Sequence, residues 1–228
     1  MALAGQGAVC IWNDITDEGR AEFYAWHLHE HMPERAAIPG FHRGRRYIAI
    51  DDATSPEFFT LYETATPAVL TSADYLARLN APTDWTKRAT QAFRNTSRAL
   101  TSVLASVGPG DGGMLGTLRF AVAPERETEI ITLIGKSVLP EMIAQPDICG
   151  AHLCATDRGA SASKTAESRD RADIRTAPDW ALLIEGCGER ALRAAMELAA
   201  RRIAAMSQGA PIAGCYRFEY CARATHQA

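Results

Sequence analysis

The side chains with the clearest chemical potential lie in one short segment. His27-Leu28-His29-Glu30-His31 places three imidazoles and one carboxylate within five residues. Imidazole titrates near neutral pH, and a neighbouring carboxylate can set its tautomer and proton affinity. Such a pair can remove a proton from a carbon acid or an enol, or deliver one to a leaving group. His31, His27 and Glu30 are therefore our candidate catalytic residues.

Two other interpretations of this segment stay open. Histidines on a helix can be a solvated face on which Glu–His pairs add a little helix stability. The segment also fits H-x-x-E-H, the inverted zinc-protease signature, in which His27 and His31 share a metal and Glu30 is the base. That site needs a further carboxylate ligand, and a five-residue match arises easily by chance in a His-rich segment. We predict no metal and no cofactor.

The segment belongs to a predicted helix over residues 17–37. At 100° per residue, five apolar residues form one stripe that should face a sheet: Ala21, Tyr24, Ala25, Leu28 and Met32. His31, His27 and Glu30 then lie on the flank of the stripe, at the rim where a cleft would open. Trp26 is expected near the far pole, and His29 on the opposite flank.

The chain repeats itself at a spacing of 107 residues. His31-Met32-Pro33-Glu34 is matched by Val138-Leu139-Pro140-Glu141. Residues 59–63 match 181–185 at a spacing of 122, so 15 extra residues fall within 157–177. That stretch is polar and is expected to be a mobile surface loop. We predict two units, 1–107 and a degenerate copy at 114–228, joined by a glycine-rich linker.

Both units follow one order of elements. The first has predicted strands at 8–13, 40–50, 57–64 and 96–106, with helices at 17–37, 67–80 and 84–93. The second has strands at 114–123, 147–156, 180–187 and 212–221, with helices at 125–144 and 189–206. The order βαββαβ is ferredoxin-like. The predicted fold class is α+β: two tandem ferredoxin-like units packing sheet to sheet as an intrachain dimeric α/β barrel.

The repeat separates shared features from unshared ones. Pro33 and Pro140 recur, and each should kink or end its helix because proline lacks an N–H donor. Three pairs of glutamates and prolines also recur and are expected to be structural: Glu34/Glu141, Pro39/Pro146 and Glu63/Glu185. Opposite His27, Glu30 and His31, however, the second unit has Ile134, Ser137 and Val138. The unshared residues are the better candidates for function.

The strand after this helix is unusually basic. Alternation predicts one face with Phe41, Arg43, Arg45 and Tyr47, and another with His42, Gly44 and Arg46. An arginine at the end of an apolar cavity suits a carboxylate or enolate oxygen. We therefore name Arg46 and Arg45 as candidate substrate-binding residues, although a solvated strand end would explain either. Tyr47, Tyr62 and Trp85 are candidate aromatic walls, or plain core.

Composition excludes several classes of partner. The 228 residues are 47% hydrophobic and 22% charged with a net charge of −3, so we expect neither nucleic-acid nor membrane binding. The N-terminus has no cationic and apolar signal pattern. No pair of the six cysteines has Cys-x-x-Cys spacing, so we expect reduced, largely buried thiols and a cytoplasmic protein.

A longer pattern resembles a known family. Phe23-Tyr24-x-Trp26-x4-His31-x-Pro33-x5-Pro39-Gly40-x6-Tyr47 resembles the EthD-like branch of the dimeric α/β-barrel superfamily. The resemblance implies that His31 occupies the family's characteristic histidine position and that substrates lie between helix and sheet. It also implies cofactor-free enzymes of aromatic and polyketide metabolism, with heme-handling relatives. Fusion of two units, and the additional His27 and Glu30, depart from the family pattern.

The predicted function is a cofactor-independent enzyme of lyase, isomerase or cyclase type. It would use histidine acid/base catalysis on a small aromatic, polyketide-like or lactone-like substrate. The first alternative is a non-catalytic protein of the same fold that binds a hydrophobic ligand or heme, and the second is a metal-dependent hydrolase. The expected partner is a small molecule, and the chain could also form a homodimer.

Overall fold

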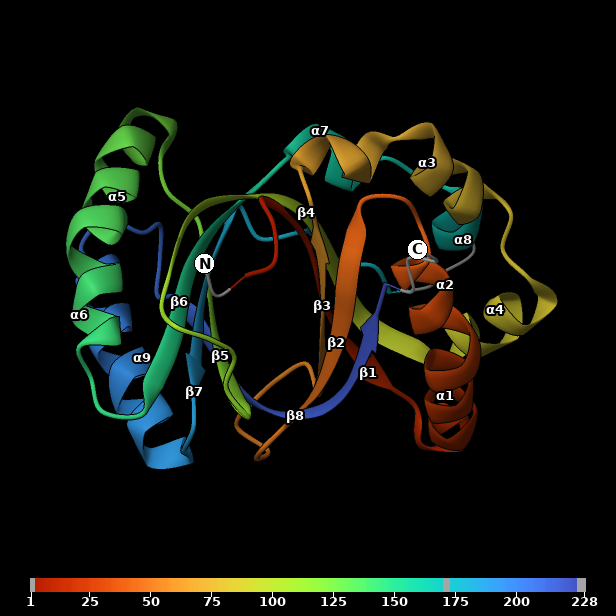
Figure 1. The fold of residues 1–228 in the computed structure, drawn as a ribbon, viewed down its shortest axis with the longest axis horizontal. Coiled ribbons are helices and arrows are strands. Elements are labelled where there is room, and N and C mark those ends of the chain that lie inside the picture. Colours follow the sequence, from red (N-terminus) through yellow and green to blue (C-terminus); the bar gives the residue numbers. More distant parts are fainter. Residues whose placement is uncertain (1–2, 170–172, 225–228) are drawn as a thin grey trace.

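Eight antiparallel strands close into a single barrel (Figure 1). The computed structural model describes residues 3–169 and 173–224. The strands run β1 (Gly7–Ile15), β2 (Phe41–Ala49), β3 (Phe58–Thr64), β4 (Phe93–Val107), β5 (Met114–Phe120), β6 (Ile148–Thr156), β7 (Trp180–Gly186) and β8 (Ile212–Arg223). Around the barrel their order is β1-β3-β2-β8-β5-β7-β6-β4.

The strand order confirms the predicted fold class. Within the first half the order is β4-β1-β3-β2, and within the second it is the equivalent β8-β5-β7-β6. The two sheets join where β2 pairs with β8 and where β4 pairs with β6. Joining both edges leaves no unpaired strand, which removes the exposed edges that a lone ferredoxin-like sheet would have.

Helices cover the outside of the barrel on two opposite sides (Figure 1). The first half contributes α1 (Arg20–Trp26), α2 (Met32–Ala36), α3 (Ala73–Asn80) and α4 (Asp84–Ala89). The second contributes α5 (Glu127–Leu133), α6 (Leu139–Ile143) and α9 (Glu189–Ala204). The interior is a separate apolar core that includes Trp12, Tyr47, Phe59, Leu61, Leu115 and Tyr216, with Leu3 buried among them.

A π-helical turn lies between the two segments of each long helix. His27–His31 joins α1 to α2, and Ile134–Val138 joins α5 to α6. The Met32 N–H donates to the carbonyl of His27, one residue further back than in an α-helix. Each turn directly precedes the helical segment that contains a proline, so the wider turn accommodates the missing N–H donor. The helices therefore continue through Pro33 and Pro140 instead of ending there.

The predicted apolar stripe of the first helix is wrong. The buried positions are Phe23, Trp26, His27, His31 and Met32, whereas Ala21 is exposed and Tyr24, Ala25 and Leu28 are only partly buried. Trp26, expected at the far pole, is fully buried, and His29 is exposed as predicted. The prediction treated the histidines as polar and therefore placed the buried face on the wrong side of the helix. The structure instead buries the face with the large aromatic rings, which cover far more area than alanine.

The polar insertion packs across the first half. Its described part contains α7 (Arg158–Ala162) and α8 (Ala166–Arg169). Asp157 N–H donates to the Leu100 carbonyl at 2.8 Å, and Ala166 N–H donates to Asn80 Oδ1 at 3.0 Å. The insertion therefore contains helices and packs on the first half, where a surface loop was predicted; positions 170–172 of that prediction lie outside the described residues.

All six cysteines lie among the described residues and are free thiols. Cys10, Cys154 and Cys215 are buried, Cys187 is exposed, and the other two are intermediate. Within residues 3–169 and 173–224, none of the helices combines the length and apolar character that crossing a membrane requires.

Candidate active site

A small cavity, here called the histidine cavity, lies between the first-half helices and the outer face of the barrel. Its volume is about 30 Å³, which is room for little more than a water molecule. The π-turn supplies His27 and His31, β1 supplies Ile11 and Asn13, and β3 supplies Thr60. Further residues complete the lining: Trp26, Arg35, Phe41, Tyr62, Tyr75, Leu79, Phe93, Arg98 and Glu167.

His27 and His31 are brought together as predicted. Their ring centroids lie 5.5 Å apart with planes 21° apart, and both side chains are buried. Trp26 packs on His31 at 4.2 Å between centroids, and Phe23 stacks on His27 at 5.0 Å. The π-turn and these aromatic contacts hold both imidazoles against the sheet, where they line the cavity together with aromatic, polar and charged side chains.

Burial and positive charge govern the protonation of His27. Burial lowers its pKa well below the usual value, and the nearby His31 and Arg46 lower it further. The Arg46 Nη1 atom lies 3.4 Å from His27 Nδ1, and Arg46 Nε donates to Glu219 Oε2 at 2.9 Å. His27 is therefore neutral near pH 7 and can accept a proton or a hydrogen bond.

Tyr62 is the predicted aromatic wall that lies in this cavity. Its ring meets His31 edge-on at 6.3 Å between centroids, and the side chain is 2% exposed. Among the described residues, the Tyr62 hydroxyl has no hydrogen-bond partner. Burial raises the pKa of Tyr62, so the hydroxyl keeps its proton and can donate it in a hydrogen bond to a bound molecule.

Two cations in the cavity were not predicted. Arg35 is buried on α2 and pairs with Glu167 of α8 and with Glu34. Arg98 on β4 donates to the Tyr75 hydroxyl at 2.9 Å. Neither sequence neighbourhood carries a motif, and α8 reaches Arg35 only because the insertion folds back onto the first half. The sequence offers no local signal for either contact.

Glu30 is turned away from the histidines and towards α4. Its Oε1 atom accepts hydrogen bonds from Thr83 Oγ1 at 2.7 Å, Thr86 Oγ1 at 3.0 Å and Trp26 Nε1 at 3.2 Å. The carboxylate thus ties the π-turn to α4 and holds the indole that packs on His31. These contacts are consistent with a positioning role for Glu30 through Trp26.

The candidate residues on strand β2 lie on two different sides of the sheet: some face the helices and others face the barrel interior. The β2–β3 register shifts between Phe41 and Arg43. Phe41 consequently packs in the helix-covered layer, whereas Tyr47 lies inside the barrel. Arg45, on the same face as Tyr47, is buried over its ring. Arg45 and Tyr47 therefore do not line the histidine cavity, and the predicted grouping of Phe41 with them is wrong.

The last two candidate substrate-binding residues, Arg46 and Trp85, lie close to the cavity but do not line it. Arg46 lies 4.6 Å above the centre of the Tyr24 ring and contacts His27. Trp85 is partly buried and packs against the cluster formed by Phe23, Trp26 and neighbouring rings. Both support the site from its edge.

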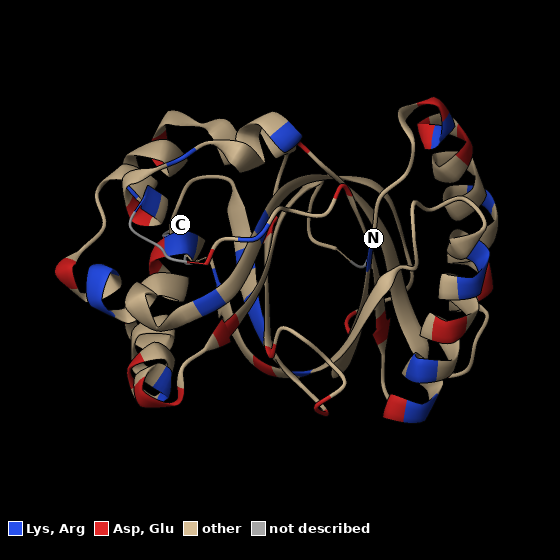
Figure 2. Cartoon of the chain, turned by 180° about the vertical axis from the view of Figure 1, so that it is seen from behind, with Lys and Arg blue, Asp and Glu red and all other residues tan. Residues whose placement is uncertain are grey.

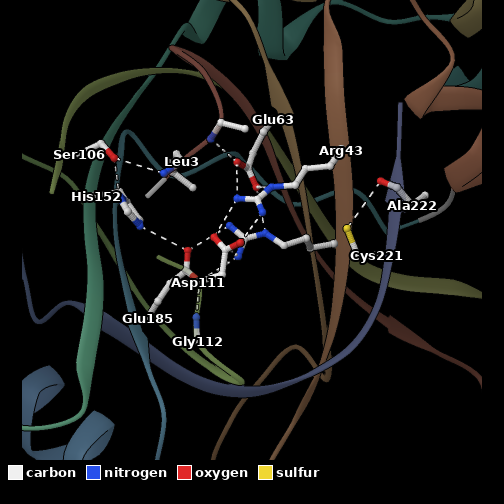
Figure 3. Close-up of polar contacts among 12 residues, drawn as sticks. Leu3, Arg43, Glu63, Ser106, Asp111, Gly112, His152, Glu185, Cys221 and Ala222 are labelled. Atoms are coloured by element: carbon white, nitrogen blue, oxygen red, sulfur yellow. Dashed lines mark hydrogen bonds and ion pairs between the residues drawn. The ribbon is translucent and has the colours of Figure 1, made fainter. Parts of the chain in front are cut away.

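A network of charges fills one end of the barrel interior (Figure 3). Glu63 Oε1 accepts from Arg43 Nε at 2.8 Å and from Arg45 Nε at 2.9 Å. The Ala4 N–H donates to the other Glu63 oxygen at 2.6 Å. Arg45 also donates twice to Glu185, at 2.8 and 3.0 Å, so one guanidinium joins the equivalent glutamates of both halves.

The second-half side of this network contains His152. Its Nε2 atom lies 3.3 Å from Glu185 Oε1, and Ser106 Oγ lies 2.9 Å from its Nδ1 (Figure 3). Burial disfavours the Glu185 carboxylate, but His152 and Arg45 outweigh that effect and lower its pKa to about 2. Glu185 is thus ionised at all physiological pH values and serves the fold, as the repeat predicted for Glu63 and Glu185.

Comparison with solved structures finds proteins with a similar fold. An anthrone oxidase-like protein aligns with a TM-score of 0.65 and 11% identity over 97% of this chain and 94% of that one. A proposed monooxygenase from Lactobacillus acidophilus aligns with a TM-score of 0.60 and 9% identity, over 96% of each chain. The chain is a single-chain dimeric α/β barrel. It matches no protein-family model and no curated protein.

A third solved structure shares this fold. A heme-binding protein from Thermus thermophilus aligns with a TM-score of 0.53 and 9% identity, over 95% of this chain and 92% of that one. In the closed form of this chain, the cavity of about 30 Å³ beneath the Trp26 ring has no room for heme, nor for any other ring, unless its cover moves.

The zinc alternative also lacks a ligand set. Over residues 3–169 and 173–224 there is no cluster of three or more His, Cys, Asp or Glu side chains that could hold a metal ion. Glu30, the base of the H-x-x-E-H interpretation, is engaged by Thr83, Thr86 and Trp26. Among the described residues, the histidine pair therefore has no third side chain to complete a metal site.

Proposed function

We propose that this barrel is an enzyme of lyase or isomerase type in which His31 acts as general acid/base on a small aromatic, polyketide-derived or lactone-like substrate. The observation that carries the proposal is the convergence of His27, His31 and the Tyr62 hydroxyl in one buried cavity that also contains aromatic and aliphatic side chains. Convergent polar groups beside apolar side chains are the usual composition of a small-molecule site. The anthrone oxidase-like neighbour supports an aromatic substrate class.

Each polar group has a definite task in this mechanism. His31 takes a proton from an acidic carbon of the substrate and later returns it to another position or to a leaving group. The Tyr62 hydroxyl donates to the developing enolate oxygen, where a buried donor is most effective. Neutral His27 supports the imidazole beside it without adding a repelling charge. No electrons are exchanged with an outside reagent, and the proton balance closes on the substrate.

Access to the cavity requires movement of its cover. A cavity of about 30 Å³ cannot hold an aromatic ring, and α8 closes one side through the ion pair between Glu167 and Arg35. Displacing α8 would free Arg35 to meet an anionic substrate group, because the guanidinium would lose one carboxylate partner. In the proposed cycle, substrate binding is thus coupled to the displacement of α8.

Hydrogen–deuterium exchange at the acidic carbon tests the proposal without knowledge of the final product. Anthrones, hydroxyaryl ketones and unsaturated lactones are incubated in D₂O with the protein and followed by NMR. We expect catalysed exchange for at least one class, its loss in His31→Ala, and retention in His29→Ala, which alters an exposed histidine two residues away. Equal exchange by His31→Ala and the unaltered protein would refute the assignment. Saturable binding without exchange would support the non-catalytic binder instead.

A further inference from the structure

A second, larger cleft lies on the insertion, outside the histidine cavity. Its volume is about 660 Å³, within the range of sites for small molecules. It is bounded by the start of β4, the end of β6, helices α7 and α8, and residues 174–179. The histidine cavity and this cleft share one lining residue, Arg98. The cleft is therefore a distinct site that adjoins the first.

The lining of the cleft is strongly basic. Five cations line it: Arg98, Arg158, Lys164, Arg169 and Arg175. A single carboxylate, Asp179, lines it with them. The whole chain carries a net charge of −3, so this concentration of positive charge does not follow from the composition. Such a local positive field attracts anions of matching size.

Internal partners neutralise only part of this charge. Arg158 pairs with Asp179 at 2.7 Å, and Arg175 pairs with Asp173 at 3.0 Å. Lys164 and Arg169 form no ion pair with any residue in 3–169 or 173–224. The hydrogen bond from Arg98 goes to a neutral phenol, that of Tyr75. Three positive charges therefore have no carboxylate partner within residues 3–169 and 173–224.

The uncompensated charge and the rest of the lining indicate the class of ligand. A phosphate monoester carries about 1.5 to 2 negative charges at neutral pH and offers several acceptor oxygens. Ser161, Ser163 and Ser168 add hydroxyl groups to the lining. Ile174, which is 54% exposed, and Ala177 form an apolar wall. This combination suits a phosphate attached to an apolar or aromatic body.

The charge distribution elsewhere argues against an extended nucleic-acid surface. The second-half helices, seen on the right of Figure 2, carry acidic and basic residues interspersed along their length. A nucleic-acid footprint needs a continuous basic stripe along one face. We propose that the cleft between α7, α8 and β4 binds a small phosphorylated molecule with an apolar or aromatic body. The proposal does not depend on catalysis by His31.

Calorimetric titration with defined probes tests this site. The probes are 1-naphthyl phosphate, 1-naphthol and inorganic phosphate, each added to the full chain. We expect 1-naphthyl phosphate to bind tightest, and its affinity to fall as salt is added. The double variant Lys164→Gln/Arg169→Gln should weaken it at least about tenfold, since two charge-assisted contacts are lost. Both side chains are exposed, so the variant should fold.

A matched variant controls for net charge. Lys87→Gln/Arg201→Gln removes one lysine and one arginine at exposed positions outside the cleft, and should leave the dissociation constant unchanged. The proposal fails if the unaltered chain shows no saturable binding at millimolar probe, or if both double variants bind alike. It also fails if 1-naphthol binds as tightly as its phosphate, or if a single-stranded oligonucleotide displaces the probe at equal phosphate concentration.

Discussion

The same backbone turn is polar in one half of the barrel and apolar in the other. The π-turn His27–His31 presents two buried imidazoles, whereas the equivalent turn Ile134–Val138 presents two fully buried aliphatic side chains. Both turns precede a helical segment that contains a proline, at Pro33 and Pro140. The turn is therefore a property of the fold, and the side chains it carries are free to differ.

The packing around the two turns differs accordingly. In the second half, Ile134, Val138 and Met142 belong to one continuous apolar cluster between helices and sheet. In the first half the corresponding layer is divided into two clusters, one around Phe23 and one around Tyr62. The histidine cavity lies between them. Buried polar groups that interrupt an apolar core lower stability. The first half contains such an interruption, and the second half does not.

The strongest test of this comparison replaces the first turn by the second. The double variant His27→Ile/His31→Val carries the residues of the equivalent turn. We expect proton exchange to fall by about 10²- to 10⁴-fold, the usual contribution of a general acid/base. The free energy of unfolding should change by only about 1 kcal/mol, because apolar side chains suit this layer. Exchange assays and urea denaturation measure the two effects. Retained exchange would contradict the hypothesis that the histidines of this turn catalyse proton transfer.

The reverse change should harm only stability. Val138→His places an imidazole in the continuous apolar cluster to which the fully buried Val138 belongs. Burying an unpaired polar group and losing aliphatic contacts should lower the free energy of unfolding by about 3 kcal/mol. Ile131→His on the same helix is the control, because Ile131 is 36% exposed. Equal effects of both variants in urea denaturation would show that the second layer is not uniquely apolar.

The repeat made much of this architecture predictable. The shared proline and the order of elements gave two ferredoxin-like units, and closure followed because each sheet needs a partner. The difference between His31 and Val138 was also visible in the sequence. What the sequence did not reveal was which face of the helix is buried, because hydropathy scales treat His27 and His31 as polar while the structure packs them between Phe23 and Trp26.

Contacts between distant segments were beyond sequence reasoning. The insertion was expected to be a mobile loop because its composition is polar, yet α8 reaches Arg35 and closes the first-half cavity. The register shift after Phe41 likewise depends on β3, so alternation along β2 alone misplaced that residue. Both misses arise from tertiary partners that local patterns do not encode.

In the barrel interior, by contrast, the two halves have equivalent buried glutamates, Glu63 and Glu185. The contribution of Glu185 to stability should depend on pH. The pKa of Glu185 is lowered from 4.5 to about 2, so its contribution to stability is complete above pH 4.5 and is lost as the pH falls towards 2. The free energy of unfolding should fall by about 3 kcal/mol over this range. Glu185→Gln should be less stable at pH 7 and should show a flatter dependence in urea titrations from pH 7 to pH 2. Parallel curves for both proteins would exclude Glu185 as the source.

The smallest expected effect concerns Glu30, which the second half replaces by an exposed serine, Ser137. Glu30 accepts three hydrogen bonds that hold Trp26 and α4 against the π-turn. Glu30→Gln keeps the shape and one acceptor oxygen but removes the charge, so we expect a loss of about 1 kcal/mol in unfolding free energy. Ser137→Ala should change nothing. Because Glu30 acts on His31 through Trp26, proton exchange should fall by less than about tenfold, with its pH profile unmoved. A shifted pH profile, or a loss as large as that of His31→Ala, would instead place Glu30 in the proton transfer itself.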